Sequence, residues 1–316
     1  MIDIVATLGQ SVFSAFCLLL FASLMSSFLY PIFQRVNQRL PTNHQSLATL
    51  FFALMAPLSA ILAVVVLTHP AIAATIVYAH CHGTSCIPHV PAPITSSFSG
   101  AVLVALAALV SLIVIYLMSK TLKLASRRQT YLEALSQPGE KSASSAFAHY
   151  RLIESDALAA WCAGLFFPRV YISTALVKKL TTEQLHAVLA HEYGHVMRRD
   201  NLRKLLLKWA STFWVPKAKH SLRHKYAAQM EELADCDSAT ITGQTELVKE
   251  VYAMFRSSDE VTQGIYQHRH VSTGNTAEMT SAARFSVVLV YLLLALLFVV
   301  LTLGLTLVAH GLLEQL

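Results

Sequence analysis

The stretch His191-Glu192-Tyr193-Gly194-His195 indicates both the fold around it and the chemistry that this fold can support. His191 and His195 are four residues apart, so on a helix their imidazoles share one face and can hold one metal ion. Glu192 points away from that pair but can reach a metal-bound water and act as its general base. The pattern therefore predicts a hydrolytic site on a helix, with Zn²⁺ as its cofactor.

The residues before this motif favour a helix over a chance match. Thr181 and Gln184 form the S/T-x-x-Q pattern of a capping box, which predicts a helix start at this point. Leu185, Val188 and Leu189 then give the spacing of a buried helical stripe. The alternative is a core helix whose two histidines are satisfied by ordinary hydrogen bonds.

Four long apolar segments surround the motif in the sequence. The chain is 55% hydrophobic and only 13% charged, with a mean hydropathy of +0.52, which lies outside the usual range of soluble proteins. The segments cover residues 5–33, 46–68, 100–118 and 285–308, and none contains Asp, Glu, Lys or Arg. Each is long enough to cross about 30 Å of hydrocarbon, so we expect four transmembrane helices.

Basic residues near the ends of these segments predict the orientation of the chain. Arg35 and Arg39 follow the first segment, four Lys and Arg residues lie between positions 120 and 128, and Arg284 precedes the last segment. Residues 69–99 contain no Lys or Arg. The positive-inside rule therefore predicts a multi-pass protein of the inner (cytoplasmic) membrane, with both termini outside and the long middle segment in the cytosol.

The predicted spans divide the chain into three parts. Residues 1–118 hold three transmembrane helices, residues 119–283 are long enough for one compact cytosolic domain, and residues 284–316 hold the fourth helix with a short tail. The net charge of +6 is explained by basic residues that flank the spans and face anionic lipid head groups. We therefore expect the lipid bilayer as a partner and no direct binding of nucleic acid.

A strand is predicted shortly before the motif helix. Arg169, Val170 and Tyr171 begin a β-branched and aromatic stretch, and Pro168 in front of them is typical of an edge strand or a strand start. An edge strand beside a metal helix would let a peptide substrate bind by adding a strand. The alternative is an ordinary core hairpin.

The third metal ligand is expected downstream, because a catalytic site of this type needs three protein ligands and one position for water. Glu231 is the strongest candidate, in a helical stretch that reads E-x-x-A-D. Asp235 lies one helical turn further on and can accept a hydrogen bond from a ligand imidazole. Glu232 points elsewhere on that helix and is the weaker candidate.

Two cysteines lie in the loop predicted to be outside the membrane. Cys81 and Cys86 could form a short disulfide there, because that compartment allows oxidation. His80, His82 and His89 lie close to them, so the loop could instead bind a soft or borderline metal. The sequence leaves both alternatives open.

These motifs resemble those of peptidase family M56, the membrane metallopeptidases that include the BlaR and MecR antibiotic-sensing receptors. The resemblance implies a mainly α-helical membrane protein, with an α+β gluzincin-like zinc metalloprotease domain between helices three and four. It also implies that His191, His195 and Glu231 hold zinc and that Glu192 activates water. The chain ends soon after the fourth span and has no S-x-x-K motif in an outside domain, so we expect no penicillin-binding sensor. The membrane peptidases of family M48, which serve quality control, are similar at this site too.

Three functions are therefore predicted for testing. The first is a regulatory integral-membrane zinc endopeptidase that cleaves itself or a cytosolic protein such as a transcriptional repressor, after a signal. The second is an M48-like protease that removes damaged membrane proteins. The third is a non-catalytic membrane receptor or scaffold. A peptide or protein substrate is the expected partner of the first two, and a homo-oligomer is compatible with all three.

Overall fold

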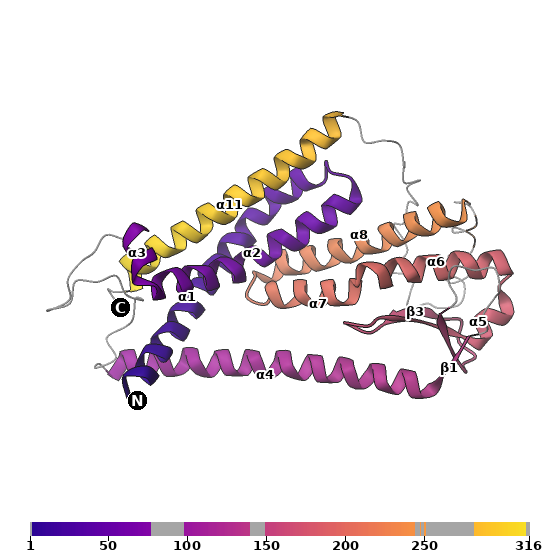
Figure 1. Ribbon diagram of the computed structural model, residues 1–316, viewed down its shortest axis with the longest axis horizontal. Helices are drawn as coiled ribbons and strands as arrows, with labels where there is room; N and C mark the ends of the chain where they lie inside the picture. The colour runs from indigo at the N-terminus through magenta and orange to yellow at the C-terminus, as the bar shows by residue number, and fades with distance from the viewer. Residues whose placement is uncertain are drawn as a thin grey trace.

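Long helices form most of the molecule in the computed structural model (Figure 1). The structure describes residues 2–76, 98–139, 149–243, 247, 250 and 281–313. Cys81 and Cys86, with the three histidines beside them, lie outside the described residues, so the two interpretations of that loop stay predictions.

In the part of the chain that the structure describes, four helices are long and apolar enough to cross a membrane, as the sequence predicted. The candidate spans are Ser11–Asn37, Thr42–Thr68, Gly100–Leu135 and Arg284–Leu307. They belong to the helices α1 (Ile2–Asn37), α2 (Thr42–Thr68), α4 (Phe98–Leu135) and α11 (Ser281–Leu313), and a short helix α3 (Pro70–Ile76) follows α2. α4 continues as one helix well past residue 118, so the predicted domain boundary at that position falls inside a helix.

The spans pack unevenly, and their outer surfaces are apolar. α1 contacts both α2 and α4, and α2 contacts α11. α4 buries little of its apolar surface inside the molecule, and side chains such as Leu112 and Tyr116 are each 64% exposed. Such a large exposed apolar surface is stable when lipid, not water, is the solvent. The start of α1 and the end of α11 lie at the same end of the bundle, away from the sheet (Figure 1).

A small sheet lies at the other end of the molecule, below α6 in Figure 1. Its strands are β1 (Ser136–Pro138), β2 (Tyr150–Ile153), β3 (Ala160–Ala163) and β4 (Arg169–Ser173), in the order β1-β2-β4-β3. β2 and β4 are parallel, and the other two pairs are antiparallel.

The predicted edge strand is wrong. β4, which contains Arg169, Val170 and Tyr171, lies between β2 and β3, and the last two of these side chains are buried. Pro168 comes immediately before the strand, where its missing N–H costs no ladder hydrogen bond, so it marks a strand start. The edge strand on this side of the sheet is β3.

Four helices complete the described part of the middle segment: α5 (Thr174–Lys179), α6 (Thr182–Arg198), α7 (Asp200–Ala210) and α8 (Pro216–Thr242). The capping box that the sequence predicted is present, because the Thr181 hydroxyl accepts a hydrogen bond from the Gln184 N–H and the Gln184 side chain accepts one from the Thr181 N–H. The motif helix therefore begins at the predicted residue.

The hairpin of α7 and α8 packs directly on the membrane-spanning helices. The Val215 N–H donates a hydrogen bond to Ser27 Oγ (3.1 Å), and the Phe213 ring meets that of Phe16 edge-on, with ring centroids 5.8 Å apart. Trp214, in the same turn, is buried in a core that also contains residues of α1, α2 and α11. One apolar core therefore joins the spans to α7 and α8, and α8 contributes to the site described next.

Candidate metal centre

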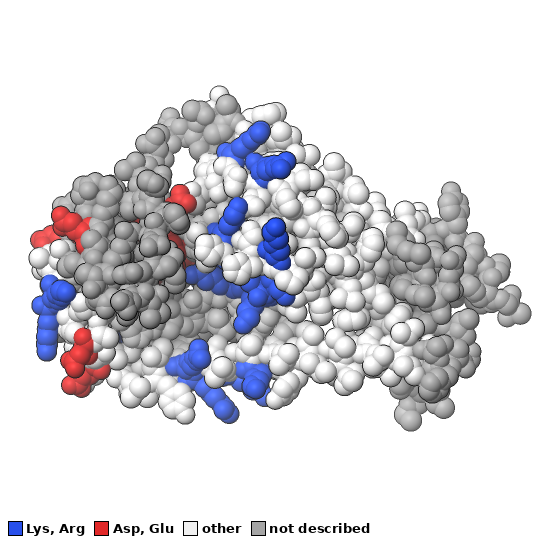
Figure 2. Space-filling view, turned by 180° about the vertical axis from the view of Figure 1, so that it is seen from behind, with Lys and Arg blue, Asp and Glu red and all other residues white. Residues whose placement is uncertain are grey.

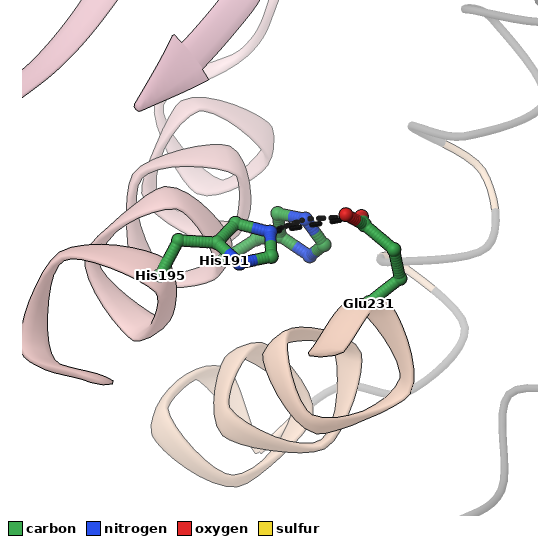
Figure 3. A group of neighbouring side chains, drawn as sticks. All are labelled: His191, His195 and Glu231. Carbon is green, nitrogen blue, oxygen red and sulfur yellow. Dashed lines mark hydrogen bonds and ion pairs between the residues drawn. The ribbon is translucent and has the colours of Figure 1, made fainter. Parts of the chain in front are cut away.

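Three side chains from two helices converge on one point. His191 and His195 of α6 point their imidazoles at the carboxylate of Glu231 on α8 (Figure 3). The two Nε2 atoms are 3.2 Å apart, and Glu231 Oε2 lies 3.7 Å from the first and 3.6 Å from the second. The ligands of a tetrahedral zinc, with bonds near 2.0–2.1 Å, stand about 3.3 Å from one another. The arrangement fits one metal ion held by all three side chains.

The second nitrogen of each imidazole faces a carboxylate. His191 Nδ1 lies 3.0 Å from Asp235 Oδ1, and His195 Nδ1 lies 2.7 Å from Asp200 Oδ2. Both aspartates are nearly inaccessible to solvent. A neutral imidazole that donates its Nδ1–H in this way keeps its Nε2 lone pair for a metal. The structure thus brings Asp235 to the place that the sequence predicted.

Asp200 is a site residue that the sequence analysis did not single out. It follows Arg199, which has a left-handed backbone (φ 52°) and forms the sharp turn between α6 and α7. That turn returns Asp200 to His195, and Arg198 holds the same carboxylate oxygen through its Nε (3.3 Å) and Nη2 (3.2 Å). An acid five residues after the second histidine was the only sequence signal for this role.

Burial and the ion pairs shift the pKa values of two of the ligand candidates, His191 and Glu231. Burial alone would lower the pKa of His191, but its contacts with Asp235 and Glu231 raise that pKa to about 9. Burial would raise the pKa of Glu231, but hydrogen bonds with both histidines and the charge of Lys204 hold it well below its ordinary value. Glu231 is therefore a carboxylate, the form that binds a metal.

Glu192 lies beside this cluster and is almost fully buried. Burial raises its pKa above the usual range for a glutamate, and the nearby His191 and His195 lower it in part. A carboxylate with a raised pKa is a better proton acceptor near neutral pH, which is the property that a general base needs. The position and environment of Glu192 are compatible with that role.

Lys204 is a cation in contact with Glu231. Its Nζ lies 3.3 Å from Glu231 Oε1, while Oε2 of the same carboxylate faces the histidines. The two oxygens are thus used for different partners, so the carboxylate would offer one oxygen to a metal. Glu232, the next residue, accepts a hydrogen bond from Thr42 (3.0 Å) and lies outside the metal cluster.

The edge strand β3 runs close to this cluster. β3 contacts α6, and Asn201 at the start of α7 donates hydrogen bonds to the carbonyls of Cys162 (3.0 Å) and Gly164 (3.3 Å). β3 pairs only with β4 among the described strands, so its other side faces no strand there.

Comparison with known families corrects the predicted relationship. The model of peptidase family M48 matches residues 105–261, a segment that contains both histidines, Glu192 and Glu231. No M56 model matches, so the M56 resemblance was wrong. Searches of the curated proteins and of the solved structures found no match. The motif helix and the downstream glutamate are similar in both families, which is why the sequence motifs alone pointed to the wrong one.

A segment that matches the M48 peptidase model and, among the described residues, four apolar helices occur in one chain. Together they fit a membrane metalloprotease. The cluster of His191, His195 and Glu231 is the place in the described residues where such an enzyme would hold its metal.

Proposed function

We propose that this protein is a membrane-embedded zinc endopeptidase of the gluzincin type. The supporting observation is the convergence of two Nε2 atoms and one carboxylate oxygen, with an aspartate behind each imidazole. Two imidazole nitrogens and one carboxylate form the His₂Glu set of catalytic zinc sites, which leave a fourth position for water. Both imidazoles would lose their proton when the metal binds. A zinc ion bound there would lower the pKa of that water and polarise the scissile carbonyl.

Glu192 is the general base of this proposal. It would take the proton of the attacking water and pass it to the leaving amine, and its raised pKa suits both transfers. Asp235 and Asp200 would keep the imidazoles oriented through the reaction, because each carboxylate lies within 3.0 Å of the ring nitrogen that faces away from the metal.

The outer edge of β3 replaces β4 as the proposed substrate-binding strand. An extended peptide added there would lie beside α6, which β3 contacts, and main-chain hydrogen bonds would hold it in line with the metal. Main-chain recognition accepts many sequences, so we expect broad cleavage of unfolded or extended segments.

Membrane proteins with exposed, unfolded segments are the proposed substrates, as in the quality-control alternative. α8, which carries Glu231, shares an apolar core with the spans, so the site is held close to the bilayer. Arg35, Arg39 and the basic residues of α4 follow the spans on that side, which supports a cytosolic site in the inner membrane. The regulatory alternative depended on the M56 resemblance and lost its support with it.

The test compares two glutamates of α6 in the purified full chain. Glu192→Gln should retain about one zinc per chain but cleave an unfolded protein such as casein about 10²–10⁴-fold more slowly than the wild type. Glu183→Gln, at the exposed start of the same helix, is the matched control and should keep full activity. Zinc is measured by mass spectrometry of the metal, and cleavage is measured by release of labelled peptides.

Two results would overturn the proposal. Full activity in Glu192→Gln would remove the proposed base. A wild-type protein that binds zinc but cleaves no unfolded substrate would favour the non-catalytic receptor or scaffold.

A further inference from the structure

Two hollows lie where the spans meet α8, away from the metal cluster. The first, which we call the polar cavity, has a volume of about 170 Å³ and includes Asn37, Gln45, Lys225, Gln229 and Glu232 in its lining. The second, which we call the apolar groove, has a volume of about 160 Å³ and is lined only by apolar residues of α1, α2 and α11, among them Val36, Phe52 and Leu293. Phe33 lines both, so the two hollows adjoin.

Their positions along the spans match the two chemical zones of a bilayer. The polar cavity lies at the last turn of the span Ser11–Asn37 and the first turns of the span Thr42–Thr68. The apolar groove reaches Leu297, well inside the span Arg284–Leu307. Lipid head groups occupy the first zone and acyl chains the second.

The walls of the polar cavity are held by hydrogen bonds between helices. Asn37 Nδ2 donates to Thr49 Oγ1 (2.9 Å) and to the Gln45 carbonyl (3.2 Å), and Gln229 Nε2 donates to Gln45 Oε1 (3.2 Å). Thr42 donates to Glu232 (3.0 Å). These bonds join α1, α2 and α8 around the cavity, so its shape is fixed without a ligand.

Several polar groups of the cavity are still open to a ligand. Asn37 is only 3% exposed, yet its Oδ1 accepts no hydrogen bond from any residue that the structure describes. A buried acceptor without a donor costs roughly 1–3 kcal/mol, so a donor from a ligand would be favourable there. Lys225 and Glu232 add one positive and one negative charge, and neither forms an ion pair with another described residue.

We propose that the two hollows form the binding site of one phospholipid whose head group has both a phosphate and a primary ammonium. The phosphate would pair with Lys225, and the ammonium would donate to Glu232 and to Asn37 Oδ1. One acyl chain would lie in the apolar groove, past Phe33. Glu232 disfavours an anionic head group, and a choline head group has no N–H to donate to Asn37.

Basic residues close to this level of the molecule support a phosphate-bearing partner. Figure 2 shows Lys and Arg side chains in a band across the middle of the molecule, with a further group at the end where the acidic side chains lie. Arg35 and Arg39 lie at the end of α1, next to the cavity residues Gln34, Asn37 and Gln38. Basic side chains at this depth attract lipid phosphates.

The test measures lipids bound to the purified full chain by native mass spectrometry, after exchange into detergent with one added lipid at a time. Phosphatidylethanolamine should bind with a stoichiometry of one and about tenfold more tightly than phosphatidylcholine or phosphatidylglycerol of the same chain length. Lys225→Ala and Glu232→Gln should each weaken that binding about tenfold. Leu293→Trp should also weaken it, because the larger ring fills the apolar groove.

Matched controls exist for the lysine and the leucine variants. Lys217→Ala removes an exposed cation of the same helix that does not line the cavity, and Leu292→Trp enlarges an exposed residue beside the groove lining. Both should bind phosphatidylethanolamine like the wild type. The measurements are repeated in Glu192→Gln, so their outcome is independent of peptidase activity.

Equal binding of the three lipids, or binding unchanged in Lys225→Ala, Glu232→Gln and Leu293→Trp alike, would overturn the proposal and indicate a non-specific lipid layer. Free phosphorylethanolamine that bound as tightly as the lipid, without any effect of Leu293→Trp, would also overturn it, because the acyl chain would then have no part in binding.

Discussion

Neighbouring residues on the two sides of α8 lie in very different surroundings. On the side that faces α6, Glu231 and Asp235 meet the two histidines, and each of these groups has a partner. On the side that faces α1 and α2, Glu232 lines the polar cavity, where Asn37 Oδ1 has no donor among the described residues. A shift of one position along the helix, about 100°, separates the two surroundings.

The difference shows how one helix can connect chemistry to the membrane. The metal side is closed by ion pairs within the protein, so a small cation is the ligand that fits there. The cavity side is fixed in shape but has polar groups left open, so a larger ligand from the bilayer fits there. Changes on one side should therefore leave the binding property of the other side largely intact.

The strongest test of this separation replaces each of the two adjacent glutamates by glutamine in a separate variant. Glu231→Gln should reduce zinc affinity by more than the roughly 100-fold expected for a residue that only supports a ligand, because it removes a charged ligand itself. Cleavage should fall with the bound zinc. Isothermal titration with zinc and cleavage of casein measure the two quantities in the purified chain.

Glu232→Gln is the matched control for that test. It should keep zinc affinity and cleavage close to wild type, because Glu232 lies outside the cluster of His191, His195 and Glu231. Comparable loss of zinc in both variants would show that the two sides of α8 are not separate.

The apolar core between the spans and α8 is tested by variants of two adjacent residues of α2, Phe52 and Phe51. Phe52 is 1% exposed, stacks on Phe33 with ring centroids 4.2 Å apart and meets Trp214 edge-on. Phe52→Ala should lower the free energy of unfolding by about 3 kcal/mol, because it leaves a cavity in this core. Thermal unfolding in detergent measures the change.

Phe51→Ala provides the comparison, since Phe51 is 39% exposed on the outer surface of the same helix. We expect a much smaller decrease in the unfolding midpoint for this variant. Equal decreases would indicate that the turn between α7 and α8 is not anchored in the spans as the structure shows.

The carboxylates behind the imidazoles should have a smaller effect on the metal than the ligands do. Asp200→Asn keeps the size of the side chain but removes the charge that orients His195, so zinc affinity should fall about 10–100-fold. Asp237→Asn is the control, because Asp237 pairs with Arg198 from the exposed side and contacts neither histidine. Zinc affinity that is unchanged in Asp200→Asn would show that the 2.7 Å contact has no influence on the metal.

Local patterns in the sequence predicted which residues of α6 and α8 come together. The four-residue spacing of His191 and His195 is helical geometry, and the capping box at Thr181 fixed where that helix begins. The E-x-x-A-D pattern placed Glu231 and Asp235 one turn apart, and the structure brings both to the histidines. Asp200 was missed because its role depends on the left-handed turn at Arg199, which no local sequence pattern predicts.

Contacts between segments that are distant in the sequence could not be predicted from local patterns. Val170 and Tyr171 are apolar enough for a strand, but whether that strand lies inside the sheet depends on β2 and β3, which have weak patterns of their own. The sequence could not predict the polar cavity either, because it forms only where Asn37, Gln45 and Gln229 from three helices meet. The family was misassigned for a related reason, since short motifs around a zinc helix are similar in M48 and M56 peptidases.

The smallest predicted effect concerns the seam that holds α8 against α6. Ser238 is 1% exposed, and its hydroxyl donates a 2.7 Å hydrogen bond to the Ala187 carbonyl of α6. Ser238→Ala should cost about 1 kcal/mol of unfolding free energy, because that buried carbonyl loses a donor. Thr240→Ala, an exposed residue whose hydroxyl bonds within its own helix, should be close to neutral. Zinc affinity should change little in either variant, since Glu231 lies two turns away.

One outcome would contradict this expectation. If Ser238→Ala lost zinc binding while its unfolding midpoint stayed near wild type, the contact between α8 and α6 would act on the metal cluster directly. The two sides of α8 would then be less independent than the structure indicates.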